Sequence, residues 1–315
     1  MVFGRALAGN YPTATSFEMG WRTLVNRLGG DETIVGHSVQ GRPLYRFDIG
    51  PKDAPPVFLT ALIHGIEVIG SVALFHILRD MAQSLPGQRT LGNMRLVMMP
   101  IVNPDAFATN MDRLDRGWPA LRRTNARGVD LNRNFPHVAP IERFHLFSGS
   151  RWRGSPHYQG PAPFSEPETQ AIRRVVEQVR PQLSIGFHSF GNMLLYPWAF
   201  SPRPNKRHAH YRQLADGFLA NLKDTKYSFR QASQFYPTVG DLDDWLDHEH
   251  GTLAMTIEVG SLNRRLWHPL RLLNPFCWMN PLRIESTVAS LVPGFTELLA
   301  GFTPLHARPA LLTAS

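Results

Sequence analysis

The feature that most constrains this chain is a series of short apolar runs separated by helical segments. The first run, residues 56–63 (PVFLTALI), is rich in strand formers, and the following VIGSVALFHILRDMA has the length and periodicity of a helix. Similar apolar runs recur at residues 95–102, 183–187, 193–198 and 253–259. This alternation is typical of an α/β sheet that is covered by helices on both faces.

Further helices are predicted over residues 165–179, 209–222 and 284–302. Ser165 with Glu168 matches a capping box that would open the first of them, and Pro181 follows its end. Segments 113–127 and 136–163 are rich in Gly, Pro, Arg and aromatic residues without periodicity, which predicts long loops. Loops of this length in a compact domain are usually functional, and ligands of open α/β sheets bind beyond the carboxyl ends of strands.

Composition predicts one compact, soluble domain. The 315 residues are 43% hydrophobic and 18% charged, which is the usage of ordinary globular proteins. Cys277 is the only cysteine, so no internal disulfide forms, which suits a reducing compartment. The first twenty residues lack a signal-peptide core, and no apolar stretch reaches the roughly 18 residues of a membrane span. A cytoplasmic location without a membrane partner is therefore expected.

The net charge of +8 raises anionic partners as an alternative. The arginines are scattered, however, and the chain contains no run of five or more basic residues. Nucleic acid is therefore not an expected partner, because binding to it requires a basic stripe or patch. The oligomeric state stays open.

His64 and Glu67 are the first candidates for chemistry. They stand at H-x-x-E spacing directly after the run at 56–63, and Gly65 would permit a sharp turn there. An imidazole and a carboxylate supply two of the three protein ligands of a catalytic zinc and leave a position for water. With 13 histidines in the chain, about one such pair is expected by chance, so the pair alone is weak.

His188 and Glu258 follow two other apolar runs and complete the candidate site. His188 would be the third ligand, although a lone histidine at a strand end is more often a hydrogen-bonded core residue. An unpaired carboxylate at the end of an apolar strand is costly, so Glu258 needs a partner. The alternatives are an arginine or the water of a nearby metal, whose proton the carboxylate could accept.

Six motifs in a matching order carry a family resemblance. They are HGIE (64–67), NPDAF (103–107), GVDLNRNFP (128–136), HSFGNMLLYPW (188–198), Tyr236 ahead of DDW (243–245), and TIEVG (256–260). With them the chain resembles the zinc metallocarboxypeptidases of the carboxypeptidase A and B group. The resemblance covers about residues 15–305 of a single catalytic domain, 1–315. It implies an α/β fold with a mixed parallel and antiparallel twisted sheet of about eight strands, covered by helices on both faces.

The resemblance also implies a role for each candidate. One Zn²⁺ per chain would be held by His64, Glu67 and His188, with Glu258 as the base that activates water. Asn132 and Arg133 would bind the terminal carboxylate of the substrate, since a guanidinium can bind a carboxylate through two parallel hydrogen bonds.

The remaining roles concern the walls of the site. Arg123 would stabilise the oxyanion, with neighbouring Arg122 as the alternative. Tyr236 would close over the substrate, and Asp130 would accept the second ring N–H of His64. Asp243 would form the floor of the pocket for the C-terminal side chain and favour a basic residue.

Two interpretations of DLDDWLDHEH (241–250) stay open. Asp241 and Asp244 crowd the stretch around Asp243, so a solvated helix start is the alternative to a specificity pocket. A second metal site at residues 248–250 is not expected, because adjacent helical residues diverge and no further ligand is evident.

The implied function is hydrolysis of the C-terminal bond of peptides that carry a free C-terminal carboxylate. Alternatives are a murein peptide amidase acting on cell-wall peptides, and an N-acyl amino acid deacylase of the aspartoacylase and succinylglutamate desuccinylase type. A catalytically silent binding module is disfavoured because Glu258 is retained. Ile66 replaces an arginine of the digestive enzymes, and no propeptide is apparent, which favours an intracellular role.

Overall fold

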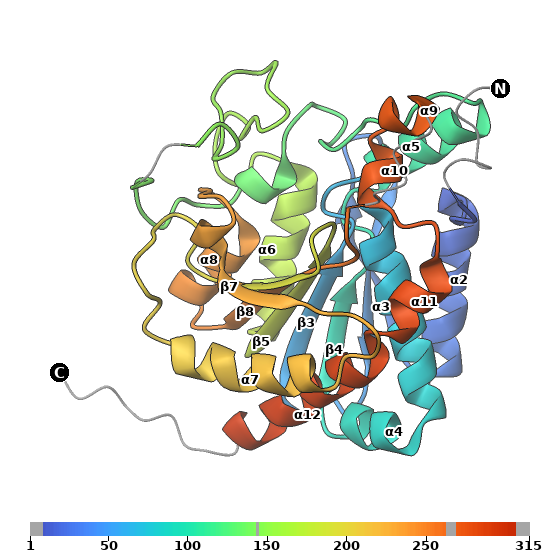
Figure 1. The fold of residues 1–315 in the computed structure, drawn as a ribbon, viewed down its shortest axis with the longest axis vertical. Helices are drawn as coiled ribbons and strands as arrows, with labels where there is room; N and C mark the ends of the chain where they lie inside the picture. Colours follow the sequence, from blue (N-terminus) through green and yellow to red (C-terminus); the bar gives the residue numbers. More distant parts are fainter. Residues whose placement is uncertain (1–8, 143–144, 263–268, 307–315) are drawn as a thin grey trace.

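The computed structural model describes residues 9–142, 145–262 and 269–306. Its centre is one eight-stranded sheet in the order β1-β2-β4-β3-β5-β8-β6-β7 (Figure 1). The strands are β1 (Asp31–His37), β2 (Pro43–Ile49), β3 (Pro56–Ala61), β4 (Arg95–Met99), β5 (Leu183–His188), β6 (Met193–Tyr196), β7 (Ser228–Gln231) and β8 (Leu253–Glu258). The predicted mixed α/β sheet of about eight strands is confirmed.

Strand direction brings the candidate residues to one edge. The four central strands β4, β3, β5 and β8 are parallel, whereas β1 pairs antiparallel with β2, β2 with β4, and β6 with β8. β7 pairs parallel with β6. Parallel strands end at the same edge of a sheet, so the segments that follow β3, β5 and β8 meet there.

Helices cover both faces of the sheet. They are α2 (Ala14–Arg27), α3 (Val68–Gln83), α4 (Leu85–Gly92), α5 (Pro104–Asp115), α6 (Pro167–Val179), α7 (His208–Ala220), α8 (Leu242–Glu249), α9 (Pro269–Leu272), α10 (Phe276–Met279), α11 (Ile284–Ala289) and α12 (Val292–His306). Apolar residues of α2, α3, α7, α11 and α12 form the larger core, and α6 and α8 form the smaller core on the opposite face. α7 and α12 lie side by side (Figure 1).

Side chains alternate between the two cores along each central strand. On β3, Val57 and Leu59 enter the larger core while Phe58 enters the smaller one. On β4, Leu96 enters the larger core and Val97 enters the smaller one. Successive side chains of a strand point to opposite faces of the sheet, and here both faces are buried in an apolar core. The central strands therefore appear in the sequence as continuous apolar runs.

The start of α6 differs from the capping-box prediction. The helix begins at Pro167, and its N-cap Glu166 makes no side-chain cap hydrogen bond. The Ser165 hydroxyl donates to Glu166 instead, and Glu168 accepts the Val39 N–H from a distant segment. Proline has no backbone N–H. Pro167 is tolerated at this position because the N–H groups in the first turn of a helix have no partner within the helix.

The predicted helix over residues 284–302 is two helices, α11 and α12, separated at Ser290 and Leu291. Pro293 lies at the second position of α12, where a missing N–H is tolerated, whereas it would break the interior of one long helix. Helix α2 and the short edge strand β7 were not predicted. Among the described residues no helix is both long and apolar enough to cross a bilayer.

The predicted loops are present. Residues 113–115, at the start of the first predicted loop, belong instead to the end of α5. Apart from the short helix η1 (Leu131–Arg133), the described part of residues 116–166 contains only turns and one isolated bridge, Ser150 with Tyr158. These loops lie at the edge of the sheet where β3, β5 and β8 end (Figure 1).

Candidate active site

The turn between β3 and α3 places His64 and Glu67 side by side. The chain leaves β3 through Leu62, whose φ of 52° is the left-handed value in this turn. Gly65 therefore has a different role from the one predicted. A Cβ on Gly65 would lie 2.2 Å from the Cβ of Ala106 on α5, so only glycine allows the turn to pack against that helix.

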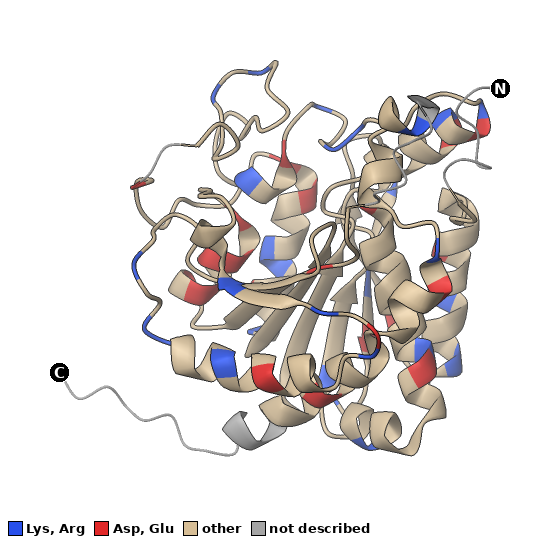
Figure 2. Cartoon of the chain, viewed as in Figure 1, with Lys and Arg blue, Asp and Glu red and all other residues tan. Residues whose placement is uncertain are grey.

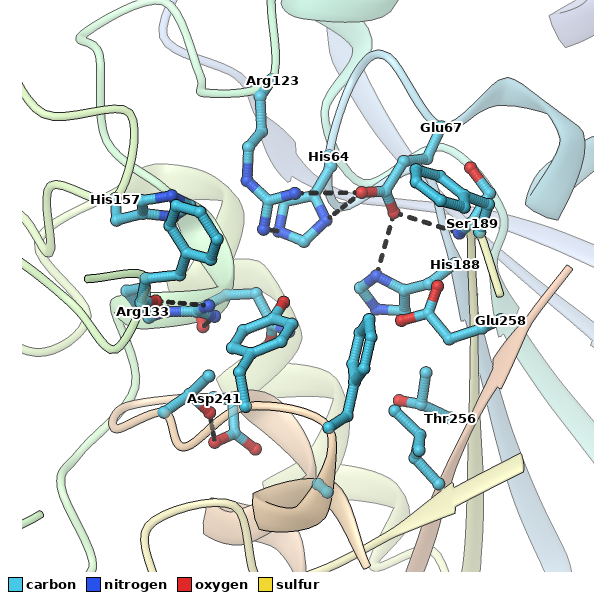
Figure 3. Close-up of a pocket in the computed structure, with 18 of the residues that line it drawn as sticks. His64, Glu67, Arg123, Arg133, His157, His188, Ser189, Asp241, Thr256 and Glu258 are labelled. Atoms are coloured by element: carbon cyan, nitrogen blue, oxygen red, sulfur yellow. Dashed lines mark hydrogen bonds and ion pairs between the residues drawn. The ribbon is translucent and has the colours of Figure 1, made fainter. Parts of the chain in front are cut away.

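His188 and Glu258 end two paired strands. They are register partners at the last positions of β5 and β8, and both are buried. His188 Nδ1 lies 3.0 Å from Glu67 Oε2. Two strand ends and one turn therefore bring two imidazoles and two carboxylates into one small space (Figure 3).

The three predicted zinc ligands form a compact donor set. One ligand atom each of His64, Glu67 and His188 lies within 4.8 Å of the others. His64 Nδ1 is buried and lies 2.9 Å from Glu67 Oε1, yet it makes no hydrogen bond there. A buried nitrogen lone pair beside a carboxylate and a second imidazole suits a metal ion. Two histidines and one carboxylate are a common ligand set of catalytic zinc.

Burial and neighbouring charges shift the pKa values of Glu67 and Glu258 in opposite directions. Burial acts to raise the pKa of Glu67, but the charge of His64 and hydrogen bonding from His188 outweigh it and hold that pKa well below the usual range. Burial raises the pKa of Glu258 to about 8, and His188 only partly offsets this. The same space thus holds one carboxylate that stays ionised and one that can carry a proton near neutral pH.

Asp130 supports His64 from behind. Its Oδ1 lies 3.1 Å from His64 Nε2, and its Oδ2 lies 3.2 Å from Arg123 Nε and 3.4 Å from His157 Nδ1. Burial would raise the pKa of Asp130, but Arg123, Arg133 and His64 lower it well below its usual range. An ionised Asp130 can accept the Nε2 proton of His64, which leaves Nδ1 free as a ligand.

The two candidate arginines, Arg122 and Arg123, lie in different surroundings. Arg123 lines the cavity, with Nη1 3.0 Å from Glu67 Oε1 and Nη2 2.7 Å from His64 Nε2. Arg122 instead donates to the carbonyl groups of Asn125 and Ala126 and holds its own loop. An Nε2 that donates to Asp130 cannot also accept from Arg123. A metal ion at Nδ1 would therefore leave the Arg123 Nη2 group available to another acceptor.

A second wall holds the predicted carboxylate-binding residues. Arg133 is buried and donates to the carbonyl oxygens of Asn132 and Phe147, with its guanidinium 5.9 Å from the ring centre of Tyr236. Asn132 Oδ1 accepts the Leu242 N–H at the start of α8, which leaves its amide nitrogen as the free polar atom. Asn132, Arg133 and Tyr236 all line the same cavity as the histidines.

Asp243 lies in the first turn of α8 and lines this cavity, and its Oδ2 accepts the Thr256 hydroxyl at 2.7 Å. Burial raises its pKa to about 7. Neighbouring Asp241 is the N-cap of α8, and Asp244 accepts the Ala199 and Phe200 N–H groups. Asp241 and Asp244 are buried, so the alternative of a solvated helix start is wrong.

These residues surround one cavity of about 620 Å³ (Figure 3). Two residues on its walls escaped sequence reasoning, His157 and Thr256. Their contacts with Asp130 and Asp243 are made across 27 and 13 residues, and no local pattern assigns either of them a role, although Thr256 opens the TIEVG motif. His248 and Glu249 lie outside the cavity and are exposed, and within the described chain only the His64 cluster has metal-ligand geometry.

Comparison with known proteins agrees with this geometry. The family model described as zinc carboxypeptidase matches residues 32–277. Carboxypeptidase B of Rattus norvegicus is 30% identical over 246 residues, which are 72% of this chain and 57% of the rat protein. Carboxypeptidase B of Astacus astacus is 28% identical over 242 residues, which are 71% of this chain and 77% of that protein. The chain thus spans little more than half of the rat relative.

Solved structures show the same fold. Carboxypeptidase A from Helicoverpa armigera superposes with a TM-score of 0.77 at 19% identity, over 95% of this chain and 75% of that one. A Pseudomonas aeruginosa metallo-carboxypeptidase, solved with (2-guanidinoethylmercapto)succinic acid, gives a TM-score of 0.56 at 19% identity, over 90% and 68%. The extent of the family match, together with the fold and the site, leads to one conclusion: this chain belongs to the zinc carboxypeptidase family.

Proposed function

We propose that this protein is a zinc-dependent carboxypeptidase that releases the C-terminal residue of peptides and favours Lys or Arg there. One observation carries the proposal. A single cavity joins the donor set of His64, Glu67 and His188 to a wall with Asn132 and Arg133, which can bind a carboxylate. An enzyme that cleaves only the terminal bond needs both features, separated by one residue of substrate.

The residues divide the chemistry among them. A zinc ion held by His64, Glu67 and His188 would polarise the scissile carbonyl and lower the pKa of the attacking water. Glu258 accepts the proton of that water and passes it to the departing amine, for which a pKa near neutrality is suited. The Arg123 guanidinium stabilises the negative charge that develops on the carbonyl oxygen. Asn132 and Arg133 orient the terminal carboxylate so that only the last peptide bond reaches Glu258.

Asp243 supports the preference for a basic residue. Its carboxylate accepts the Thr256 hydroxyl, and no cation of the described chain lies within ion-pair distance of it. Burying that negative charge is unfavourable, and an ammonium or guanidinium of the substrate relieves the cost.

The proposal is tested with purified, zinc-loaded protein and a panel of peptides that end in Lys, Arg, Phe, Asp or diaminopimelate. Each peptide is used with a free and an amidated C-terminus, with a chelator control, and products are identified by mass spectrometry. Release of one residue from free-carboxylate peptides only, fastest for Lys or Arg, is the expected result.

Other outcomes point elsewhere. Activity restricted to diaminopimelate would support the murein peptide amidase, and cleavage of N-acyl amino acids alone would support a deacylase. No chelator-sensitive cleavage of any substrate would favour a binding module. A cytoplasmic site of action also stays a proposal, supported by the single cysteine.

A further inference from the structure

The proposed chemistry gives no role to the turn at residues 145–148, which belongs to the long loop 136–163. This turn consists of His145, Leu146, Phe147 and Ser148. We propose that the 145–148 turn is a positioning element for the substrate carboxylate, in which Phe147 acts through Arg133 and Tyr236. The inference rests on the proposed carboxypeptidase function and assigns residues that orient its carboxylate-binding wall.

The hydrogen bonds of Arg133 decide which of its donors can reach a substrate. A guanidinium carries five N–H groups, one on Nε and two on each Nη. The Arg133 Nε and Nη2 donate to the Phe147 carbonyl oxygen at 3.3 and 3.1 Å, and Nη1 donates to the Asn132 carbonyl oxygen at 2.7 Å. Within the described chain this leaves one N–H on each Nη, which is the pair that binds a carboxylate through two parallel hydrogen bonds. The Phe147 carbonyl therefore fixes the guanidinium in the orientation that carboxylate binding needs.

Aromatic contacts connect the same turn to Tyr236. The Phe147 ring lies edge-on to the Tyr236 ring with centres 6.1 Å apart, and the His145 ring stacks on Tyr236 at 5.9 Å. The Tyr236 ring centre in turn lies 5.9 Å from the Arg133 guanidinium, within the range of a cation–π interaction. The 145–148 turn thus contacts both the guanidinium that would bind the carboxylate and the ring that would close over it.

Phe147 packs against a third residue of this wall. Its ring centre lies 5.1 Å from that of His157, and His157 Nδ1 lies 3.4 Å from Asp130 Oδ2. Arg133 and His157 lie on the same side of the cavity (Figure 3). The Phe147 ring therefore touches two residues of the wall, while the carbonyl oxygen of the same residue holds Arg133.

The ends of the turn are held by backbone hydrogen bonds, whereas its centre is held by the Phe147 ring. The Ser148 N–H donates to the His145 carbonyl at 3.0 Å, and the Ser148 carbonyl accepts the Val239 N–H at 3.1 Å. The Phe147 N–H donates only to the His145 ring, at 3.3 Å from Nδ1. Shortening the Phe147 side chain should therefore release its carbonyl from Arg133 without unfolding the loop.

The test compares Phe147→Ala with a conservative variant and a neighbouring control. For a peptide that ends in Lys, KM should rise ~10-fold in Phe147→Ala while kcat stays within ~2-fold, because the lost contacts hold the ground state and the transition state equally. Phe147→Tyr keeps the ring and should restore KM to within ~3-fold of the wild type. Leu146, 74% exposed and absent from the cavity wall, gives the control Leu146→Ala with unchanged kinetics. A fall in kcat alone, or the same rise of KM in the control, would overturn the proposal.

A double-mutant cycle examines the route through Tyr236. In a Tyr236→Ala background the ring contact is already lost, so Phe147→Ala should raise KM by only ~3-fold. A full ~10-fold rise in that background would show that the two rings are not coupled and would refute this part of the proposal.

Two measurements separate this inference from the function on which it rests. Calorimetry with Glu258→Gln compares the affinities of free-carboxylate and amidated peptides, and Phe147→Ala should reduce the preference for the carboxylate. NMR measures how fast the Arg133 Nε proton exchanges with water, which should be several-fold faster in Phe147→Ala than in the wild type or Leu146→Ala. If the wild type releases no residue from any peptide, the proposed function fails, and exchange at Arg133 still decides whether the turn orients this guanidinium. Equal exchange in all three proteins would refute it.

Discussion

Asp243→Asn should make the metal-free protein more stable at pH 8 and remove its preference for basic substrates. Asparagine keeps an oxygen that can accept the Thr256 hydroxyl but carries no charge. Burial raises the Asp243 pKa from 3.8 to about 7, so the folded state resists ionisation more than the unfolded state does. The charged form therefore destabilises the fold, and the substitution removes that penalty.

The magnitude follows from the shift in pKa. A difference of about three units corresponds to roughly 4 kcal/mol at most, at ~1.4 kcal/mol per unit. Asp243 lines an open cavity and is only half-buried, so solvent screening reduces the gain to ~2 kcal/mol. With an unfolding entropy of ~2.1 cal/mol/K per residue, this raises Tm by ~3 °C for a chain of this length.

The pH dependence gives the sharper test. The penalty is small near pH 4, just above the unfolded pKa of 3.8, grows as pH rises toward the folded pKa of about 7 and levels off above that. Thermal unfolding of both chelated proteins between pH 4 and 8 measures it, with Asp216→Asn on the surface as control. A gain that is equal at all pH values, or a lower Tm at pH 8, would refute the reasoning.

In activity assays of Asp243→Asn the preference for terminal Lys over Leu should fall by ~100-fold, consistent with the 2–5 kcal/mol lost with one partner of a buried charge pair.

Three further predictions concern the rest of the site. Glu258→Gln should bind zinc normally and lose at least ~100-fold in kcat, measured with metal analysis on the same sample; a near-normal rate would contradict its assignment. Arg123→Ala should lower kcat ~100-fold with little change in KM, whereas Arg122→Ala should chiefly lower Tm, since only Arg123 lines the cavity. Gly65→Ala should destabilise the fold by ~1–3 kcal/mol in denaturant titrations, and Ala106→Gly should recover part of that loss, because the two Cβ atoms would lie 2.2 Å apart.

Local sequence was sufficient for the central strands and for the order of the motifs. The runs at 56–63 and 253–259 are apolar on both faces, so burial dictates a central strand whatever the rest of the chain does. Strands that run parallel end at the same edge of a sheet, and because β3, β5 and β8 are parallel, the residues His64, His188 and Glu258 meet there. The family resemblance added Asn132, Arg133 and Asp243, which no spacing rule selects.

Tertiary structure decided what depends on distant contacts. Arg122 and Arg123 are neighbours with the same chemistry, and only the packing of their loop shows which one enters the cavity. The acidic start of α8 is compatible in sequence with a solvated helix end, but burial against distant strands makes Asp244 an acceptor for backbone N–H groups and gives Asp243 a raised pKa. The burial and the pKa of a side chain depend on how much water reaches it. Segments that are distant in the sequence exclude that water only in the folded protein, so the sequence around the residue does not determine either property.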